Sequence, residues 1–487
     1  MAIEIYDWDD LDDVRLDVTE SYVLMNDLTS STSGYSSVAS STANSGAGWS
    51  PITSFSGTFD GADYEIQSMY IENNSTTYMA FFGTLSTGAE IKNVKLFDIT
   101  FYEKNSRVGG LVGLISAVNE ITIDNCHVTG VIELFPECTA GRAGAIVAFM
   151  NVSTGGAFKS TIKNCTSSAD VKYIPTSGVN NNSNILVGGF GGHLAGDVEI
   201  DNCHVVGNPS VRTQGEKLGG FAGAAPNNII IKNCSAEATV LNRRNNNGWA
   251  RTGGFVGDAF NATFDNCFSN SSVSYSGIGQ NSSIDAFGGF CGQLLNGTIS
   301  NCYSIGSMSI ESGADAIGGF VGLLGSNFPS GTGTTLKCYA SMSMSGVGIS
   351  SGTYVGGFSG TGYSDAYVTE DSFWNTTVSG LSTSFTGTGK TTTEMRDIDT
   401  YTDTATAGLD EAWSMTTLSS HNGESSPNLW AIDDGNAYPI LWYEVVPSTG
   451  VSVGIKIGGT FEQKPLMIKK SGVFEQVGEK QVGGWSA

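Results

Sequence analysis

The sequence predicts an all-β protein: a parallel, right-handed β-solenoid with a cap at each end and a small β module at the C-terminus. Two short motifs recur at solenoid spacing, and a column of alternating charges lies beside one of them. Successive copies lie between 31 residues (Cys203 to Cys234) and 39 residues (Cys126 to Cys165) apart. The repeats are rich in Gly, Ser, Thr and Asn and carry no apolar stripe of helical period. Their length and variable loops favour solenoid coils over propeller blades.

The first motif is an apolar residue, a charged or polar residue, asparagine and, in most copies, cysteine. Asparagine adopts turn conformations readily. We therefore predict a corner at the asparagine, with the apolar residue and the cysteine facing the core and the charged residue facing solvent. This predicts an asparagine ladder at Asn93, Asn125, Asn164, Asn202, Asn233, Asn266 and Asn301, and a buried thiol stack at Cys126, Cys165, Cys203, Cys234, Cys267 and Cys302.

The residue before each asparagine alternates in sign along the chain. In a parallel stack, equivalent side chains of neighbouring strands lie about 4.8 Å apart. Alternating charges then form favourable neighbour pairs, each worth roughly 0.2–1 kcal/mol. The column indicates that successive coils are in register, and it consists of Lys92, Asp124, Lys163, Asp201, Lys232 and Asp265.

The second motif, Gly-Gly-Phe-x-Gly or a close variant, precedes most copies of the first. Glycine permits close backbone approach and the aromatic residue can fill the core, so we predict a second corner. The motif lacks the spacing of a dinucleotide-binding loop and no helix follows it, so no cofactor is expected. Its copies span residues 109–113, 188–192, 219–223, 253–257, 288–292, 318–322 and 356–360.

The order of the chain follows from these repeats. Residues 1–59 are expected to form the N-terminal cap that an open solenoid end needs. Residues 7–16 can form a short amphipathic helix with an acidic start, and residues 21–28 a strand. The solenoid body is predicted over residues 60–377. An aromatic-rich cap over 378–446 and a basic tandem-repeat module over 447–487 complete the chain.

The glycine motifs resemble the GLUG motif of large adhesin-like surface proteins. The segments Trp49–Ile52, Gly57–Gly61 and Tyr438–Trp442 are similar to the flanks of such arrays. The similarity covers about residues 3–443. It implies a β-solenoid exposed on a surface, and it carries over no catalytic residue.

The C-terminal module resembles the short repeats at the ends of tail and fibre proteins of tailed viruses. Ile455–Gln463 recurs thirteen residues later as Ile468–Gln476. This resemblance, with the absence of a recognisable secretion leader, favours a virion component over a cellular adhesin.

Composition limits the partners. The net charge is −24, which makes nucleic acid a poor partner. No run of 18 apolar residues exists, so no membrane span is expected. Most of the nine cysteines fall in the repeat column, so we expect buried free thiols rather than a disulfide framework.

Candidate site residues are few. Arg243, Arg244 and Trp249 lie in a long polar loop and are the preferred ligand contacts; the loops around 174–184 and 208–217 are also long and polar. No metal site is expected, since His127 and His204 each follow a column cysteine and should face away from it.

Glycan cleavage would need two carboxylates at a set separation. The outward aspartates Asp124, Asp201 and Asp265 recur only every second coil, about 9–10 Å apart on the strand spacing. That separation is at or beyond the upper limit for a hydrolase pair. Loop acids could still form a site, so a glycan-depolymerising spike stays a third hypothesis.

The leading hypothesis is a non-enzymatic virion structural protein of a tailed virus, such as a fibre, spike or turret. It would lie on the virion surface or tail, contact other virion proteins and bind host cell-surface glycan or glycoprotein. By analogy with fibres we expect a homo-oligomer, specifically a trimer. The alternative is an extracellular adhesin or surface-layer protein.

Overall fold

The structure is a computed structural model of the 487-residue chain, which divides into two compact units. The first comprises Met1–Thr392 with Ala407–Asp410, and the second comprises Thr393–Thr406 with Glu411–Ala487. The structure describes residues 2–73, 78–103, 106–116, 120–135, 138, 140–152, 160–173, 184–244, 249–277, 284–311, 314–327, 330–351, 354–363, 367–420, 429–444, 455–457, 460–462, 467–470 and 473–476.

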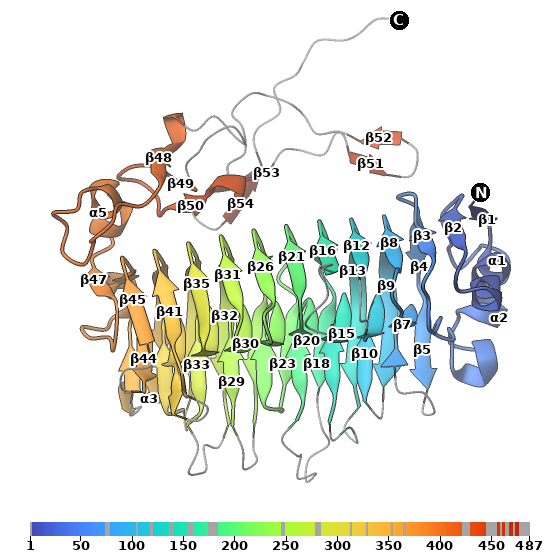
Figure 1. The fold of residues 1–487 in the computed structure, drawn as a ribbon, viewed down its shortest axis with the longest axis horizontal. Coiled ribbons are helices and arrows are strands. Elements are labelled where there is room, and N and C mark those ends of the chain that lie inside the picture. Colours follow the sequence, from blue (N-terminus) through green and yellow to red (C-terminus); the bar gives the residue numbers. More distant parts are fainter. Residues whose placement is uncertain are drawn as a thin grey trace, which may run out of the picture. The chain divides into compact units, whose positions relative to one another are not determined.

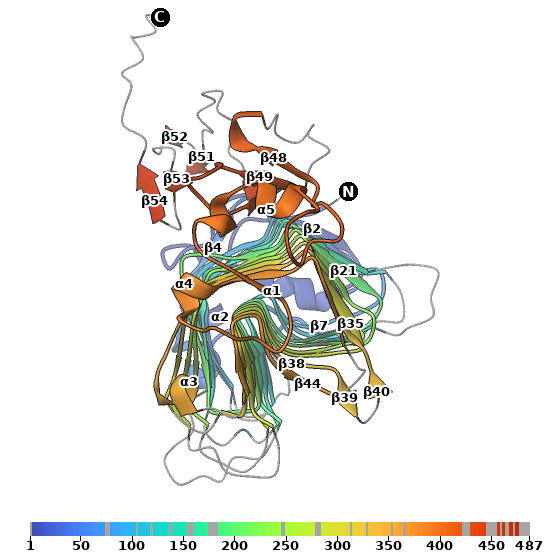
Figure 2. The same ribbon diagram turned by 90° about the vertical axis from the view of Figure 1, so that its left-hand side faces the viewer.

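The first unit is a β-solenoid of about nine turns, so the predicted fold class is confirmed. In each turn the chain passes through four parallel sheets, named sheets 1 to 4 in chain order. The asparagine corner joins sheet 1 to sheet 2, and the glycine corner joins sheet 3 to sheet 4. Figure 1 shows the turns side by side, and Figure 2 looks along the stack, where the strands of successive turns superimpose.

Sheets 1 and 2 flank the asparagine corner. The twelve strands of sheet 1 are, in spatial order, β1 (Ile3–Ile5), β2 (Ser21–Leu24), β3 (Thr58–Asp60), β8 (Glu90–Lys92), β12 (Thr122–Asp124), β16 (Ser160–Lys163), β21 (Val198–Asp201), β26 (Ile230–Lys232), β31 (Thr263–Asp265), β35 (Gly297–Ser300), β41 (Gly333–Leu336) and β45 (Tyr367–Glu370). The strands of sheet 2 are, in chain order, β4 (Glu65–Gln67), β5 (Tyr70–Asn73), β9 (Lys95–Glu103), β13 (His127–Leu134), β17 (Thr166–Ser167), β18 (Asp170–Tyr173), β22 (His204–Val205), β23 (Ser210–Thr213), β27 (Ser235–Ala236), β28 (Thr239–Asn242), β32 (Phe268–Tyr275), β36 (Tyr303–Ile310), β42 (Tyr339–Ser345), β46 (Phe373–Asn375) and β47 (Thr388–Lys390).

Sheets 3 and 4 flank the glycine corner and have nine strands each. Sheet 3 consists of β6 (Tyr78–Met79), β10 (Arg107–Gly109), β14 (Arg142–Gly144), β19 (Leu186–Gly188), β24 (Lys217–Gly219), β29 (Arg251–Gly253), β33 (Ala286–Gly288), β37 (Ala316–Gly318) and β43 (Tyr354–Gly356). Sheet 4 consists of β7 (Phe82–Leu85), β11 (Val112–Ile115), β15 (Val147–Asn151), β20 (Gly191–Ala195), β25 (Ala222–Pro226), β30 (Val256–Phe260), β34 (Cys291–Leu295), β38 (Val321–Leu324) and β44 (Ser359–Gly362).

The N-terminal segment covers the first turn and also contributes strands to it. The expected helix forms as α1 (Trp8–Asp13) followed by a 3₁₀ turn, η1 (Val14–Leu16). Asp7 caps α1 by accepting hydrogen bonds from the backbone N–H groups of Asp9 and Asp10. Because β1, β2 and β3 are the first strands of sheet 1, that sheet begins within the segment predicted as a cap. Further helical turns of this unit are α2 (Tyr35–Val38), η2 (Ala43–Gly46), α3 (Val347–Ser351) and α4 (Thr376–Ser379), and β39 (Ser326–Asn327) pairs antiparallel with β40 (Ser330–Gly331).

The second unit is small and its strands are short. A mixed three-stranded sheet packs around aromatic side chains, with the Trp413 and Trp430 rings 4.8 Å apart. The tandem repeat forms two successive antiparallel hairpins of equal register, in which Ile455 pairs with Glu462 and Ile468 with Glu475. Its elements are η3 (Glu394–Arg396), α5 (Asp399–Thr402), β48 (Met415–Thr417), η4 (Leu418–Ser420), β49 (Trp430–Ile432), β50 (Ile440–Leu441), η6 (Trp442–Glu444), β51 (Ile455–Ile457), β52 (Thr460–Glu462), β53 (Met467–Lys470) and β54 (Val473–Gln476).

The glycine corner is tight because each of its glycines faces backbone. A Cβ on Gly253, the first glycine of its motif, would lie 2.1 Å from the carbonyl oxygen of Val256 within the same bend. A Cβ on the last glycine, Gly257, would lie 2.7 Å from the backbone nitrogen of Leu218 in the preceding turn. Sheet 4 therefore folds directly back against the outer face of sheet 3.

Inside the same corner the aromatic residue of each motif stacks on that of the next turn. The neighbouring rings of Phe221 and Phe255 lie 4.7 Å apart at 4°, and those of Phe255 and Phe290 lie 4.8 Å apart at 2°. All these side chains are fully buried. The stacked rings are Phe190, Phe221, Phe255, Phe290, Phe320 and Phe358.

The glycine corner generates a prediction on stability. Gly257→Ala should destabilise the fold by about 1–3 kcal/mol, because the added methyl group meets backbone that can move only if two turns separate. The measurement is the thermal midpoint followed by circular dichroism. Thr263→Ala, at an exposed position of β31 in the same turn, is the matched control. Equal midpoints for the two variants would contradict the tight packing described here.

Candidate functional site

The asparagine corner is built on left-handed backbone. Asn93, Asn125, Asn164, Asn202, Asn233, Asn266 and Asn301 all have φ between 50° and 55°. Asparagine tolerates this region better than other residues with a side chain, because its short polar group can bond locally. The corner lets the cysteine that follows point back into the core, where Cys126, Cys165, Cys203, Cys234, Cys267 and Cys302 are all buried.

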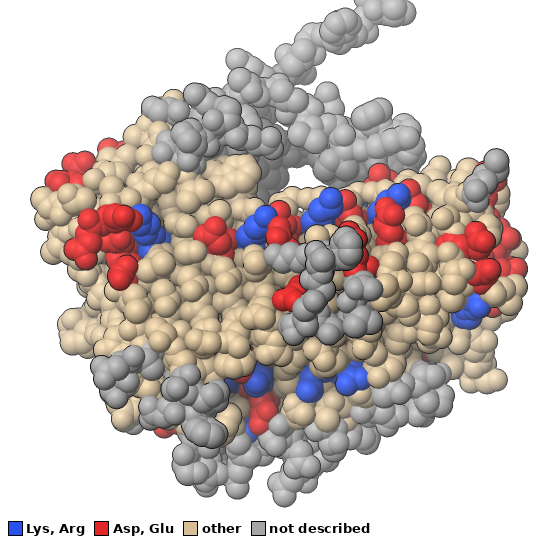
Figure 3. All heavy atoms as spheres, viewed as in Figure 1, with Lys and Arg blue, Asp and Glu red and all other residues tan. Residues whose placement is uncertain are grey.

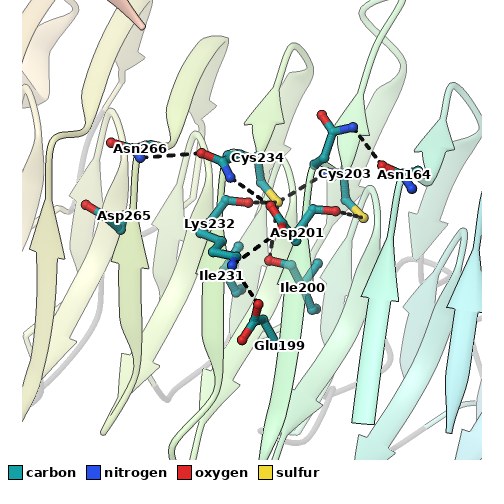
Figure 4. A network of polar contacts seen from close by, with 12 residues as sticks. Asn164, Glu199, Ile200, Asp201, Cys203, Ile231, Lys232, Cys234, Asp265 and Asn266 are labelled. Atoms are coloured by element: carbon teal, nitrogen blue, oxygen red, sulfur yellow. Dashed lines mark hydrogen bonds and ion pairs between the residues drawn. The ribbon is translucent and has the colours of Figure 1, made fainter. Parts of the chain in front are cut away.

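The side-chain amides of the corner form a ladder with a period of two turns. Asn164 donates to Asp124 Oδ1 (2.8 Å), and Asn202 donates to Asn164 Oδ1 (2.9 Å). The next pair repeats the pattern: Asn233 donates to Asp201 (2.8 Å) and Asn266 to Asn233 (3.4 Å). Figure 4 shows the part of this run between Asn164 and Asn266. The sequence predicts one ladder of asparagines along this corner. In the structure, the acceptor of each asparagine amide is alternately an aspartate and an asparagine of the preceding turn.

The charge column and the amide ladder are one network. Lys163 Nζ lies 3.3 Å from Asp124, and Lys232 Nζ lies 3.4 Å from Asp201. Asp124 and Asp201 are thus each bound by both the lysine and the asparagine of the following turn, whereas Asp265 is bound by Ser300 and Asn301. Among the described residues no ion pair joins a lysine to the aspartate of the turn after it, so the expected pairing on both sides occurs on one side only.

This network generates a second prediction. Asn233→Gly loses the hydrogen bond to Asp201 but keeps a residue suited to positive φ, whereas Asn233→Ala loses both. The alanine variant should therefore be less stable than the glycine variant by about 1–2 kcal/mol. Thermal unfolding of both variants against the native chain measures the difference. Equal stability would show that the left-handed corner is not a constraint.

The thiol column is structural. All nine cysteines are buried and free. Each column thiol donates to a backbone carbonyl two residues earlier, as Cys234 Sγ does to Lys232 O at 3.0 Å. Burial raises the pKa of Cys338, which keeps that thiol protonated and unreactive. No cluster of His, Cys, Asp or Glu that could hold a metal occurs among the described residues.

The histidines that follow the column cysteines lie on the outer side of sheet 2. His204 bonds Ser235 Oγ through Nδ1 (2.9 Å) and Asn202 Oδ1 through Nε2 (3.0 Å), and His127 Nδ1 bonds Thr166 Oγ1. These contacts tie the histidines to the asparagine corner. Burial lowers the pKa of His204 to about 4.

A pH dependence follows from that shift. Between pH 6.5 and 4, His204 is protonated in the unfolded chain but stays neutral in the folded chain. Its contribution to the free energy of unfolding is therefore fully present above pH 6.5 and is lost as the pH falls toward 4. We expect the thermal midpoint of the native protein to drop over this interval, and that of His204→Gln to drop less. Identical pH profiles for the two proteins would refute the role given to His204.

The structure separates the three predicted ligand contacts. Arg243 is exposed and Trp249 is 56% exposed, but Arg244 is only 2% exposed. Burial lowers the pKa of Arg244, while Asp285 and Glu216 oppose the shift. Arg244 is therefore a buried cation and not an exposed side chain, and ligand contact by the three residues stays a prediction. Residues 245–248 and 174–183 lie outside the described residues, and the expected loop at 208–217 contains strand β23.

Trp249 borders a different surface, named the inner corner here. It is formed where the outer faces of sheets 3 and 4 meet at the glycine bend. Lys217 Nζ bonds Asp258 Oδ2 (2.5 Å) across this bend, and Arg251 Nε bonds Gln293 Oε1 (2.6 Å). The inner corner consists of Tyr78, Arg107, Arg142, Lys217, Trp249 and Arg251 on the sheet 3 side and Phe149, His193, Asp258 and Gln293 on the sheet 4 side.

Basic and aromatic side chains alternate at one end of the inner corner. The Arg107 guanidinium carbon lies 4.4 Å from the centre of the Phe149 ring and 5.1 Å from that of Tyr78. The His193 ring stacks on Phe149 at 4.9 Å and 22°. At the other end the Arg251 guanidinium lies 5.6 Å from the Trp249 ring. Figure 3 shows basic side chains gathered on the lower half of this face, where Figure 1 labels β10 and β29.

Sequence reasoning missed this site, although its signal is present. Arg107, Arg142, Lys217 and Arg251 each stand two residues before the first glycine of their turn's corner, where Gly144-Ala145 replaces the glycine pair in one turn. That column holds four basic residues in a chain of net charge −24. A position-by-position comparison of the glycine motifs would have shown it.

The fold and its surfaces define a parallel β-solenoid with a polar ladder at one corner and a basic-aromatic surface at another. No family model matches the sequence, and no curated protein matches it. Among solved structures, one described as "a putative immunoglobulin A1 protease from Bacteroides ovatus" is similar, with a TM-score of 0.36 and 16% identity over 91% of this chain and 92% of that chain. A similarity at this level carries no argument about activity.

Proposed function

We propose that this chain is a non-enzymatic structural protein of a tailed virus, a fibre, spike or turret, that binds glycan or glycoprotein on the host cell surface. The observation that carries the proposal is the inner corner, where basic side chains occupy four of five consecutive rungs of a register-locked stack and aromatic rings lie at both ends. Such a surface presents the same contact chemistry repeatedly to an extended polymer. Aromatic rings provide a large contact area at low entropic cost, and basic side chains make the binding specific through charge complementarity.

Two further observations support the virion part of this proposal. The tandem repeat folds as two hairpins of equal register, as a repeated attachment or tip element would. The outward aspartates Asp124 and Asp201 are engaged by lysine and asparagine, and Asp265 by serine and asparagine, which suits a structural rather than a hydrolytic role. Other virion proteins and further copies of the chain would be the partners of assembly.

A cellular adhesin is the second candidate, because the glycine motifs resemble those of adhesin-like surface proteins. The two proposals share the binding surface and differ in where the protein resides. Mass spectrometry of purified virions separates them: the virion proposal predicts peptides of this chain, and their absence would leave the adhesin.

The binding function is tested with the full chain on a glycan array that carries neutral and acidic sugars. We expect retention of at least one glycan class without release of new reducing ends. Release of reducing ends would favour a depolymerising spike. No retention of any glycan, together with no binding to cell envelopes, would overturn the proposal.

In the described part of the chain no helix is long and apolar enough to cross a membrane.

A further inference from the structure

The solenoid carries charged columns of two kinds. In the column of the asparagine corner, opposite charges alternate and each lysine meets an aspartate. In the inner corner, Arg107 is the direct register partner of Arg142, and Lys217 that of Arg251. Like charges directly opposite each other in a ladder destabilise it. The fold thus places four cations in one column, where an alternation of positive and negative side chains would be more stable.

The Arg107–Arg142 end of the inner corner holds the larger excess of positive charge. Within the described residues Arg107 contacts two aromatic rings, and its buried Nε has no hydrogen-bond partner. Arg142 bonds the carbonyl oxygens of Gly141 and Asn184 and the Asn184 side chain, none of which is a carboxylate. By contrast, Lys217 already binds Asp258.

The ionisation of neighbouring groups reflects this excess. Burial, and then the charges of Arg142, Lys217 and Arg107, lower the pKa of His193 to about 3. Burial, and then the charge of Arg107, lower the pKa of Arg142 to about 10. Asp258 and Glu216 are the acids near these groups, and burial raises the pKa of Glu216. The buried Nδ1 of His193 also lacks a hydrogen-bond partner among the described residues.

We propose that the inner corner binds an acidic glycan, with Arg107 and Arg142 holding sugar carboxylates and Trp249 offering its exposed ring to a sugar further along the stack. The inference rests on the proposed function and names its ligand class. Arginine forms paired hydrogen bonds with carboxylates, and neighbouring rungs set two such groups about 4.8 Å apart. From Arg107 to the exposed Trp249 beside Arg251 the column spans about four rungs, about 19 Å, which fits an extended polymer. Arg251 itself is buried and supports the Trp249 ring.

Acidic glycan is favoured over nucleic acid by the rest of the molecule. A net charge of −24 repels a long polyanion everywhere except along this column. The column is narrow: four of its five rungs carry one basic residue and Leu186 occupies the fifth, between Arg142 and Lys217. Aromatic rings stand at both of its ends. Sugar carboxylates spaced along a chain of apolar sugar faces match that pattern better than a continuous phosphate backbone.

The test is binding of the full chain to polygalacturonate and to polysialic acid, with neutral dextran and poly-glutamate as comparison polymers, measured by biolayer interferometry. We expect binding of at least one of the acidic glycans that weakens with salt, and weak or no binding of dextran and poly-glutamate. In R107Q/R142Q, affinity for that glycan should fall about tenfold or more, because charge-assisted contacts are lost. The thermal midpoint should change little, because removal of a like-charge pair offsets the hydrogen bonds that Arg142 loses.

The matched control is K172Q/R212Q. Lys172 and Arg212 are also register partners, on the outer face of sheet 2, and Lys172 is neutralised by Asp170 at 2.8 Å. This variant makes the same change in net charge and should bind as the native chain does. R107K/R142K keeps the positive charges but lacks the planar guanidinium groups that bind a carboxylate through two hydrogen bonds, so it should retain part of the affinity. A second readout is the His193 pKa, which should rise when the glycan is bound and stay unchanged with dextran.

The outcomes separate this inference from the proposed function. Equal loss in both glutamine variants, or native affinity in R107Q/R142Q, would overturn the site assignment while leaving glycan binding intact. Equal binding of poly-glutamate would overturn the sugar assignment. Failure to bind any glycan, neutral or acidic, would remove both the inference and the binding function.

Discussion

The hydrogen bond from each corner asparagine to the turn before it sets the register on which the rest of the structure depends. Backbone pairing alone would let one parallel strand slide against the next. A left-handed asparagine that must find one acceptor in the preceding turn fixes the alignment at the same point of every rung. Because the acceptor alternates between asparagine and aspartate, the repeating unit of the polar network is two turns, although that of the backbone is one.

The core and the outer surfaces inherit that register. Rings such as Phe221 and Phe255 can stack almost parallel only if neighbouring glycine corners coincide. The same coincidence brings Arg107 beside Arg142 on the outside of sheet 3. The glycine corner folds sheet 4 back onto sheet 3, so that side chains from two strands of a turn contribute to one surface. Equivalent side chains of successive repeats are thereby aligned in columns along the solenoid.

The repeats predicted the architecture because their chemistry is local. The positive φ of Asn125 and the inward position of Cys126 follow from residue type and strand period. The charge alternation implied stacking, but not that Asp124 and Asp201 would each be shared by a lysine and an asparagine of one neighbour. That detail depends on the stagger between turns, which residue type does not encode.

The binding surface was harder to foresee, because it depends on which strands face each other across a bend. Arg244 and Trp249 share a loop in the sequence, yet one is buried and the other exposed. Trp249 instead lies beside Arg251, which follows it by two residues and belongs to the next strand. Contacts between the third and fourth sheets, such as that of Lys217 with Asp258, cannot be read from spacing within one repeat.

Electron paramagnetic resonance distances along the charged column test the central claim most directly. Spin labels would replace Asp124 and Asp265, four rungs apart, and in a second sample Lys92 and Ser300, six rungs apart, while the buried native thiols stay unlabelled. Rung-by-rung stacking predicts separations near 19 and 29 Å, about 4.8 Å per turn. Distances that do not grow in proportion to the number of turns would contradict the account.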